Sequence, residues 1–161
     1  MSYRPQLTDA ARPATLTIAA INERGETVPT QIAGEHPLTL YLDKREIVTL
    51  MTLGQAPEAL AIGYLRNQRL VAHLEDIVAV QVDWETDSVA ITTHRSAEDL
   101  DARMEKRTVT TGCGQGTMFG DLMAEIDKVS LPAQARFDED TLYGLLDAVR
   151  HHESIYKQAG A

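Results

Sequence analysis

Three leucines at alternate positions constrain the fold of this chain more than any other feature. Leu38, Leu40 and Leu42 are each separated by one more polar residue. Because successive side chains of a strand point to opposite faces, all three should lie on one face of a sheet. A polar turn at residues 43–45 follows, and the chain returns as a second strand with the sequence EIVTLMT. Residues 37–52 are therefore predicted to form a β-hairpin with one face in the core.

Similar patterns predict further strands at residues 15–21, 77–82 and 88–93. Pro57 is predicted to begin a helix, because its missing N–H group costs nothing at a first helical position. Residues 60–65 supply the apolar stripe of that helix. We expect the strands to share one buried layer that contains Leu38, Leu40, Val80, Val82 and Ile91.

The C-terminal third contains the strongest helical signal of the chain. A short β-like run at residues 107–111 precedes a predicted helix at residues 118–129, and another helix is predicted to start near Asp138. Acidic residues in the first turn of this last helix stabilise its N-terminal dipole. Its apolar stripe is predicted to face a second buried layer and consists of Leu142, Leu145, Leu146 and Val149.

These elements indicate a chain in three parts. We predict a flexible arm at residues 1–13, a β-rich domain at residues 14–104 and a further part at residues 105–161. The fold class is α/β, of the α+β kind. The last part supplies about one strand for two helices, whereas helices of a layered fold need several strands to cover them. Either the two halves share a sheet or the chain is the front part of a longer protein, and we prefer the second interpretation.

Composition excludes several classes of partner. The chain has 161 residues, of which 15 are basic and 24 acidic, and its net charge is −9. Binding to nucleic acid or to an anionic membrane needs the opposite sign, so we expect neither partner. No apolar run approaches the roughly 20 residues that span a bilayer, and the first residues lack a signal-peptide pattern. A single cysteine excludes an intramolecular disulfide and suits a reducing compartment, so we expect a cytoplasmic protein.

That single cysteine carries the most distinctive chemistry. Cys113 lies in a glycine-rich segment with Gly112, Gly114, Gln115 and Gly116, after a β-like run and before a predicted helix. A thiol near a helix N-terminus gains thiolate character, and the thiolate is the reactive form. The alternative is a small buried hydrophobic side chain, but three nearby glycines make dense burial a poorer interpretation. We predict a reactive cysteine.

Other kinds of site fit the sequence less well. The glycines around the cysteine miss the spacing of nucleotide-binding fingerprints, and no lysine follows them as in a Walker A loop. Asp83, Glu85 and Asp87 copy the start of a calcium loop, but Ser88 stands where that loop needs glycine, so we predict a turn of solvated carboxylates. The adjacent histidines 151–152 point about 100° apart on a helix and are expected to be exposed. No metal site is predicted.

Several short segments of the chain occur in an order typical of one family. The matching segments are Glu35–Leu40 (EHPLTL), Met51–Thr52, Leu60–Leu65 (LAIGYL), Asp76–Ile77, Thr111–Gly114 (TGCG) and Leu142–Ala161. Together they resemble the formate dehydrogenase accessory sulfurtransferases, the FdhD/NarQ family, over about residues 30 to 161. The resemblance implies a second domain similar in fold to cytidine deaminases, of which this chain would hold the beginning.

The resemblance also implies a function. Proteins of this family take persulfide sulfur from a cysteine desulfurase and pass it to the molybdenum (or tungsten) bis-guanine-dinucleotide cofactor, which formate dehydrogenase needs for activity. Cys113 matches the first cysteine of the family loop C-G-x-C-G and is the implied persulfide position, with Gly112, Gly114, Gln115 and Gly116 as the supporting loop. The expected partners are a cysteine desulfurase and formate dehydrogenase, and a homodimer is left open.

Three departures from the family pattern matter. Gly116 replaces the second loop cysteine, so no thiol relay operates within the loop. Leu53–Gly54 and Asn67–Arg69 replace other family residues. The chain also ends where the cofactor-binding domain of the family begins. We therefore assign no cofactor-binding residues and expect no tightly bound cofactor.

Two rival interpretations remain at the level of the sequence. The chain is either a sulfurtransferase or a shortened, non-catalytic homologue that serves as a binding module for the desulfurase, the dehydrogenase or the cofactor. An unrelated thiol hydrolase would need a histidine base, and His151 or His152 can be nominated for that role but not argued. The ordered set of motifs disfavours this last interpretation.

Overall fold

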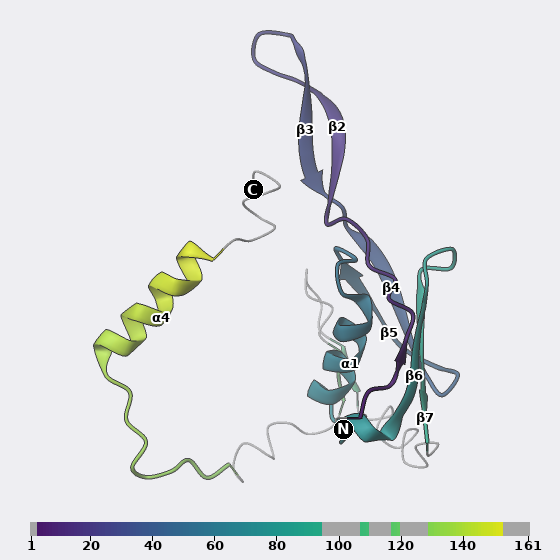
Figure 1. Ribbon diagram of the computed structural model, residues 1–161, viewed down its shortest axis with the longest axis vertical. Coiled ribbons are helices and arrows are strands. Elements are labelled where there is room, and N and C mark those ends of the chain that lie inside the picture. The colour runs from purple at the N-terminus through teal and green to yellow at the C-terminus, as the bar shows by residue number, and fades with distance from the viewer. Residues whose placement is uncertain (1–2, 95–106, 110–116, 120–128, 153–161) are drawn as a thin grey trace.

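The computed structural model describes residues 3–94, 107–109, 117–119 and 129–152, and these form an α+β protein (Figure 1). The strands are β1 (Gln6–Leu7), β2 (Thr15–Ile21), β3 (Thr27–Ala33), β4 (His36–Leu42), β5 (Arg45–Thr52), β6 (Ile77–Asp83), β7 (Ser88–Thr93), β8 (Arg107–Val109) and β9 (Thr117–Phe119). The helices are α1 (Pro57–Asn67), the short 3-10 helix η1 (Leu74–Asp76) and α4 (Glu139–His151). No helix in the described part is long and apolar enough to cross a membrane.

A five-stranded sheet with the order β1-β6-β7-β4-β5 forms the body. The hairpins β4–β5 and β6–β7 are antiparallel, whereas β4 joins β7, and β1 joins β6, in parallel. The predicted hairpin at residues 37–52 and the strands at 15–21, 77–82 and 88–93 are confirmed. Helix α1 begins at Pro57 as predicted and lies along the sheet (Figure 1).

The predicted core layer is confirmed. Leu38, Leu40 and Leu42 are completely buried, and Ala61 and Leu65 of α1 are buried in the same cluster. Strands β6 and β7 complete the layer with Ile77, Val80, Val82, Val89 and Ile91. The body is therefore held together by one apolar face of the sheet, which packs against the apolar stripe of helix α1.

A two-residue turn joins β4 to β5. Asp43 and Lys44 adopt left-handed backbone angles, with φ of 46° and 73°, as a tight hairpin turn of the twisted kind requires. The Asp43 carboxylate accepts hydrogen bonds from the Thr93 N–H at 2.9 Å and the Thr93 hydroxyl at 2.7 Å. This contact ties the turn to the end of β7 and offsets the strain of the turn. Arg45, which was predicted to lie in the turn, belongs to β5.

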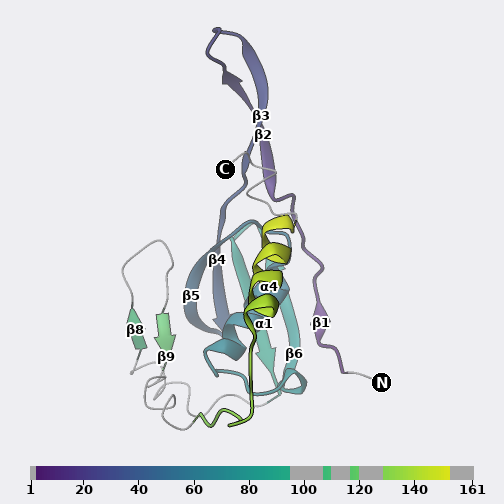
Figure 2. The ribbon, with the colours of Figure 1, turned by 90° about the vertical axis from the view of Figure 1, so that its left-hand side faces the viewer.

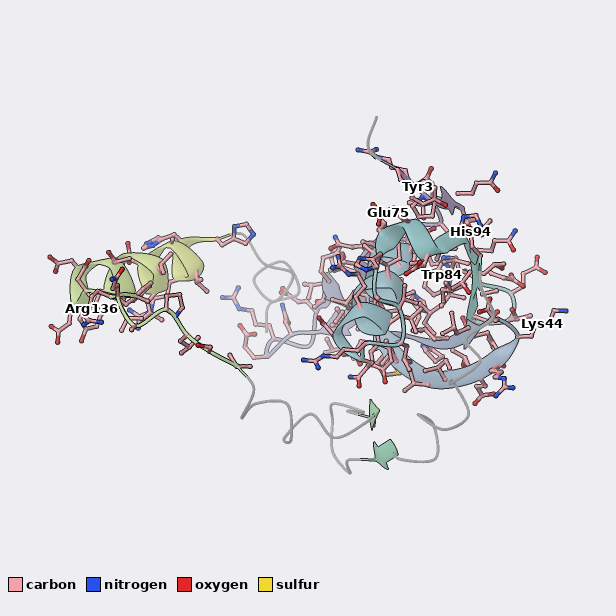
Figure 3. All side chains as sticks on the ribbon, turned by 90° about the horizontal axis from the view of Figure 1, so that it is seen from below. Tyr3, Lys44, Glu75, Trp84, His94 and Arg136 are labelled. Carbon is pink, nitrogen blue, oxygen red and sulfur yellow. The ribbon has the colours of Figure 1, made fainter. Side chains whose placement is uncertain are left out.

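The N-terminal residues differ from the flexible arm predicted at residues 1–13. Gln6 and Leu7 form strand β1 beside β6. The Thr8 hydroxyl donates to the Val80 carbonyl and accepts from the Val82 N–H. The Tyr3 hydroxyl donates to the Ile77 carbonyl at 2.6 Å, and Tyr3 lies beside His94 at the end of the body (Figure 3). Sequence periodicity misses this segment because backbone pairing to an open sheet edge needs no apolar pattern.

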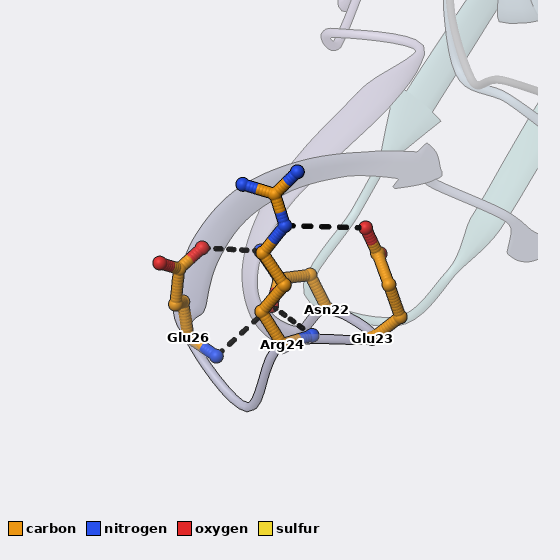
Figure 4. A network of polar contacts seen from close by, with 4 residues as sticks. All are labelled: Asn22, Glu23, Arg24 and Glu26. Carbon is orange, nitrogen blue, oxygen red and sulfur yellow. Dashed lines mark hydrogen bonds and ion pairs between the residues drawn. The ribbon is translucent and has the colours of Figure 1, made fainter.

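Strands β2 and β3 form a separate two-stranded sheet that projects from the body (Figures 1 and 2). At its base the Gly34 N–H donates to the Ala14 carbonyl at 2.8 Å. At its tip the Asn22 side chain accepts from the N–H groups of Arg24 and Glu26, each at 2.9 Å (Figure 4). Gly25 supplies a positive φ of 75° there, which glycine adopts without strain. Hydrogen bonds therefore define both ends of the projection.

The C-terminal part differs from expectation at strand β9. Strand β9 (Thr117–Phe119) pairs with β8, so the helix predicted at residues 118–129 does not begin at Met118. The pair forms its own small sheet, and the described residues of the two halves do not share one. Helix α4 begins as predicted, with the Asp138 carboxylate accepting from the Thr141 N–H, which lowers the Asp138 pKa. The cytidine-deaminase-like fold and the domain boundary near residue 105 stay predictions.

The second buried layer expected at α4 is not present in the described part of the chain. Every residue of α4 is exposed, and Figure 1 shows the helix apart from the sheet. The apolar stripe is exposed by 46% at Leu142, 53% at Leu145, 45% at Leu146 and 74% at Val149. Helix α4 is amphipathic as predicted, but none of the other described elements packs on its apolar stripe.

We predict that Leu40→Ala destabilises the body strongly. Leu40 is completely buried in the central layer, so the substitution removes apolar contacts and leaves a cavity at a cost of about 2–5 kcal/mol. Met51→Ala is the matched control, because Met51 lies on the neighbouring strand and is 56% exposed. Urea denaturation followed by circular dichroism measures both. Equal losses in the two variants would contradict the proposed core.

Candidate functional site

Two described strands lie on either side of Cys113 in the sequence. Cys113 itself and the loop residues 112–116 lie outside the described residues. On either side, Val109 of β8 pairs with Thr117 of β9 in antiparallel register. Residues 110–116 therefore connect the ends of two paired strands, and Cys113 is the middle one of these seven residues.

The local sequence favours this pairing. Strand β8 has the sequence RTV and β9 has TMF, and both contain the β-branched or aromatic residues that fit a pleated strand. Glycines at 112, 114 and 116 fall between the two strands in the sequence, and glycine is common in connections between strands. The strand–glycine-rich connection–strand order replaces the strand–loop–helix order that the sequence predicts. Because residues 117–119 form a strand, no helix begins directly after the glycine-rich segment. The expected effect of a helix dipole on the Cys113 thiol therefore loses its basis.

Three of the six segments that resemble the FdhD/NarQ pattern contribute buried residues to the core of the body. Leu38 and Leu40 of the segment EHPLTL are completely buried, and so are Ala61 and Leu65 of LAIGYL. Ile77 begins β6 and is also completely buried. These residues pack the core and so carry the fold. The prediction of a reactive cysteine concerns the segment around Cys113, which lies outside the described residues.

A cluster of polar and aromatic side chains lies at one end of the five-stranded sheet, and the sequence reasoning missed it. We call it the Trp84 cluster, and it consists of Arg12, His36, Glu58 and Trp84. The Arg12 guanidinium lies 4.6 Å from the centre of the Trp84 ring, within the range of a cation–π contact. The His36 ring lies 5.8 Å from the same ring at a tilt of 55°.

Two hydrogen bonds fasten the N-terminal segment to this cluster. The indole N–H of Trp84 donates to the Ala10 carbonyl at 2.6 Å, and the Ala10 N–H donates to the Glu58 carboxylate at 2.9 Å. The Arg12 N–H donates to the Gly54 carbonyl at 2.7 Å. Gly54 has a positive φ of 72° and lies against the Arg12 and Trp84 side chains, so glycine is needed at that position on two grounds.

Glu58 is the one buried charged side chain among the described residues, with 6% of its surface exposed. It lies in the first turn of α1, where the helix dipole favours a negative charge. Because the carboxylate also accepts a hydrogen bond from Ala10, its burial is compensated. The Trp84 cluster is therefore a clamp that holds residues 10–12 against the sheet. The available sequence signal was the single tryptophan directly after a strand.

Asp83 and the histidine pair are exposed, as the sequence predicts. Asp83 is exposed, and its carboxylate accepts from the Glu85 N–H and the Thr86 hydroxyl, which lowers the pKa of Asp83. His151 and His152 are exposed at the C-terminal end of α4. Within the described ranges, no three or more His, Cys, Asp or Glu residues gather closely enough to hold a metal ion. Burial raises the pKa of Tyr64 in α1.

Comparison with known proteins assigns the chain to a family. The model of the FdhD/NarQ family matches residues 33–161. Because this match covers most of the chain, the chain belongs to the FdhD/NarQ family, as the ordered motifs predict.

Several curated relatives carry the name sulfur carrier protein FdhD. The relative from Listeria monocytogenes serotype 4b (strain F2365) is 21% identical over 137 residues, which is 84% of this chain and 52% of the relative. The relative from Xanthomonas campestris pv. campestris (strain B100) is 26% identical over 142 residues, which is 86% of this chain and 50% of the relative. The chain thus spans about half the length of these relatives.

One solved structure is also similar. The crystal structure of a formate dehydrogenase accessory protein from Desulfotalea psychrophila has 21% sequence identity and a TM-score of 0.43, over 50% of this chain and 38% of that chain.

We predict that Trp84→Phe releases the N-terminal segment. Phenylalanine keeps an aromatic ring but loses the N–H that bonds Ala10, and loss of this half-buried hydrogen bond costs about 1 kcal/mol. Glu85→Gln is the control, because the Glu85 side chain is exposed and adjacent in the chain. Hydrogen exchange measured on peptides that cover residues 6–12 should accelerate in Trp84→Phe and not in Glu85→Gln. Unchanged exchange in Trp84→Phe would show that the clamp does not depend on this bond.

Proposed function

We propose that this chain is a sulfur carrier in which Cys113 holds the sulfur as a persulfide. Family membership supports the proposal, and the relatives from Listeria and Xanthomonas are named sulfur carriers. The observation that carries it is the position of the one cysteine in the chain, midway along the glycine-rich segment that connects β8 and β9. The supporting residues would be Gly112, Gly114, Gln115 and Gly116, which give the thiol room to meet a bulky donor.

The loading step is a thiol exchange. The Cys113 thiolate attacks the outer sulfur of a persulfide on a cysteine desulfurase. A new S–S bond forms to Cys113, and the S–S bond of the donor breaks. The donor cysteine leaves as a thiolate, which takes up the proton that the Cys113 thiol lost before the attack. No electron is gained or lost overall, so loading needs no separate oxidant. A second nucleophile can then remove the outer sulfur and regenerate the thiol.

The proposed partners follow from the same assignment. The donor would be a cysteine desulfurase, and the acceptor would be the molybdenum (or tungsten) bis-guanine-dinucleotide cofactor on its way to formate dehydrogenase. We place the step in the cytoplasm because a single unpaired thiol persists in a reducing compartment.

We predict that the chain gains the mass of one sulfur atom when incubated with a cysteine desulfurase and free cysteine. The gain should map to Cys113 by peptide mass spectrometry, because no other residue of the chain offers a thiol. Cys113→Ser should abolish the gain and leave the far-UV circular dichroism unchanged. A reductant should remove the added sulfur from the wild type. Retention of the gain in Cys113→Ser would overturn the proposal.

The second candidate function is a non-catalytic binding module. One observation favours it: Gly116 stands where the family loop has a second cysteine. Such a module would bind the desulfurase, the dehydrogenase or the cofactor without accepting sulfur. Co-sedimentation of the chain with a desulfurase, combined with absence of the mass gain, would favour the module over the carrier.

We predict that these residues bind guanine nucleotides weakly. A dinucleotide cofactor is strongly anionic, so a tight site needs several basic or backbone donors around its phosphates. The chain carries a net charge of −9 and one glycine-rich segment with Arg107 as its nearest upstream basic residue. Calorimetry with guanosine diphosphate should show no sub-micromolar binding. Sub-micromolar binding would place a nucleotide site within these residues and contradict this prediction.

A further inference from the structure

Strand β5 forms an open edge of the five-stranded sheet. The order β1-β6-β7-β4-β5 leaves β5 paired on one side only, with β4. At the other edge the N-terminal segment covers β6 through strand β1, and the Trp84 cluster fastens that segment to the body. The chain therefore closes one edge of its sheet and leaves the other edge without a partner among the described strands.

Hydrogen bonds of β4 show which of its backbone groups face β5. The Thr39 N–H donates to the Asp87 carbonyl at 2.8 Å, on the side of β7. Successive residues of a strand turn their N–H and C=O groups to opposite sides. The neighbouring residues Leu38 and Leu40 therefore turn theirs toward β5.

The open backbone groups of β5 follow from this pattern. The residues of β5 that lie opposite the two leucines are Leu50 and Val48, so these two point their N–H and C=O groups inward, to β4. Thr49 and Met51 alternate with them and point their groups to the open side. Met51 is also 56% exposed. The edge thus presents two donors and two acceptors at the spacing of a β-ladder.

This edge lacks the features that keep a strand from pairing with another chain. Natural sheets protect an edge with proline, with charged side chains or with a bulge. Residues 48–52 contain neither proline nor a charged side chain, and the register shift between Leu40 and Tyr41 falls outside this stretch. An extended polypeptide is the ligand that such an edge recognises, because a second backbone supplies the matching donors and acceptors.

The proposed transfer of sulfur supplies a polypeptide for this position. The donor in that transfer is a protein, whereas the acceptor is a cofactor without a polypeptide backbone. Figure 2 shows the β8–β9 pair on the β5 side of the sheet and strand β1 on the far side. A donor that extends the sheet at β5 is therefore held on the same side as the strands that flank Cys113 in the sequence.

We propose that an extended segment of the sulfur donor adds to the sheet as a further strand beside β5. This inference rests on the proposed function, because it names the surface at which the donor of that function docks. The donor backbone pairs with the open groups of Thr49 and Met51. Donor side chains on the core face then lie beside Val48 and Leu50, which pack in or against the core, so apolar residues are favoured at alternate positions of the donor segment.

Hydrogen exchange of single amides, followed by nuclear magnetic resonance, tests this geometry. In the free chain the amides of Thr49 and Met51 should exchange fast, whereas those of Val48 and Leu50 should be protected by their bonds to β4. Addition of a cysteine desulfurase should slow the exchange of Thr49 and Met51. Protection of these two amides before the desulfurase is added would overturn the proposal, since another segment or a second copy would already hold the edge.

Two substitutions at one position separate the backbone from the side chain. Met51→Pro removes the outward N–H and spares the pairing with β4, because an edge strand tolerates proline where the N–H faces outward. Met51→Ala shortens the same side chain and keeps the N–H. Sulfur gain on Cys113 is measured against desulfurase concentration. Met51→Pro should need at least about fivefold more desulfurase than Met51→Ala for half-maximal loading, with a similar maximal rate.

Equal desulfurase requirements of Met51→Pro and Met51→Ala would overturn the proposal. Should Met51→Pro change the far-UV circular dichroism, the amide exchange of the wild-type chain decides instead. Failure of that exchange to slow at Thr49 and Met51, in a chain that gains sulfur from the desulfurase, would then overturn the proposal.

Inorganic polysulfide distinguishes this docking inference from the proposed function. It can load Cys113 by the same exchange of S–S bonds but has no backbone to pair with β5. A wild-type chain that gains sulfur neither from polysulfide nor from the desulfurase would contradict the proposed function, and the docking inference with it. A chain that gains sulfur from both, with equal desulfurase requirements of the two Met51 variants, would overturn the docking inference alone.

Discussion

The burial of strand β4 is the constraint on which the rest of the body depends. It pairs with β5 on one side and with β7 on the other, and its three leucines are completely buried. Because side chains alternate, a shift of β4 by one residue would move all three leucines to the opposite face. Register, sheet order and the position of α1 are therefore set together. The Asp43 carboxylate reinforces the same register by fastening the β4–β5 turn to Thr93 of β7.

The Trp84 cluster extends this arrangement to the N-terminus. Glu58 is held in the first turn of α1, and through Ala10 it is linked to the Trp84 indole at the end of β6. The Arg12 guanidinium lies over the indole ring. These contacts connect three segments that are far apart in the sequence. Their role is to keep the sheet edge and the first helix together.

Sequence periodicity predicted the body well because its strands bury one face each. The leucines of β4 and the valines of β6 alternate clearly, and Pro57 marks the start of α1. Strand β1 was missed because two residues held by backbone pairing leave no apolar pattern. Strand β9 was taken for the start of a helix because Thr117–Phe119 is too short to show a period. The stripe of α4 was recognised, but an amphipathic pattern shows which face is apolar and not what covers it. For the site, Cys113 stays a prediction of the sequence, whereas the Trp84 cluster depends on contacts between distant segments and left no sequence pattern.

In the proposed function, Cys113 both receives sulfur and gives it up. The most direct measurement supplies a desulfurase with cysteine that contains radioactive sulfur, isolates this chain, and then adds cyanide. Cyanide removes the outer sulfur of a persulfide as thiocyanate and leaves the thiol. If Cys113 is the sulfur carrier, radioactivity binds to the wild-type chain and is released by cyanide as thiocyanate. Cys113→Ser shows neither the binding nor the release. A chain that binds the desulfurase but acquires no radioactive sulfur would contradict the account.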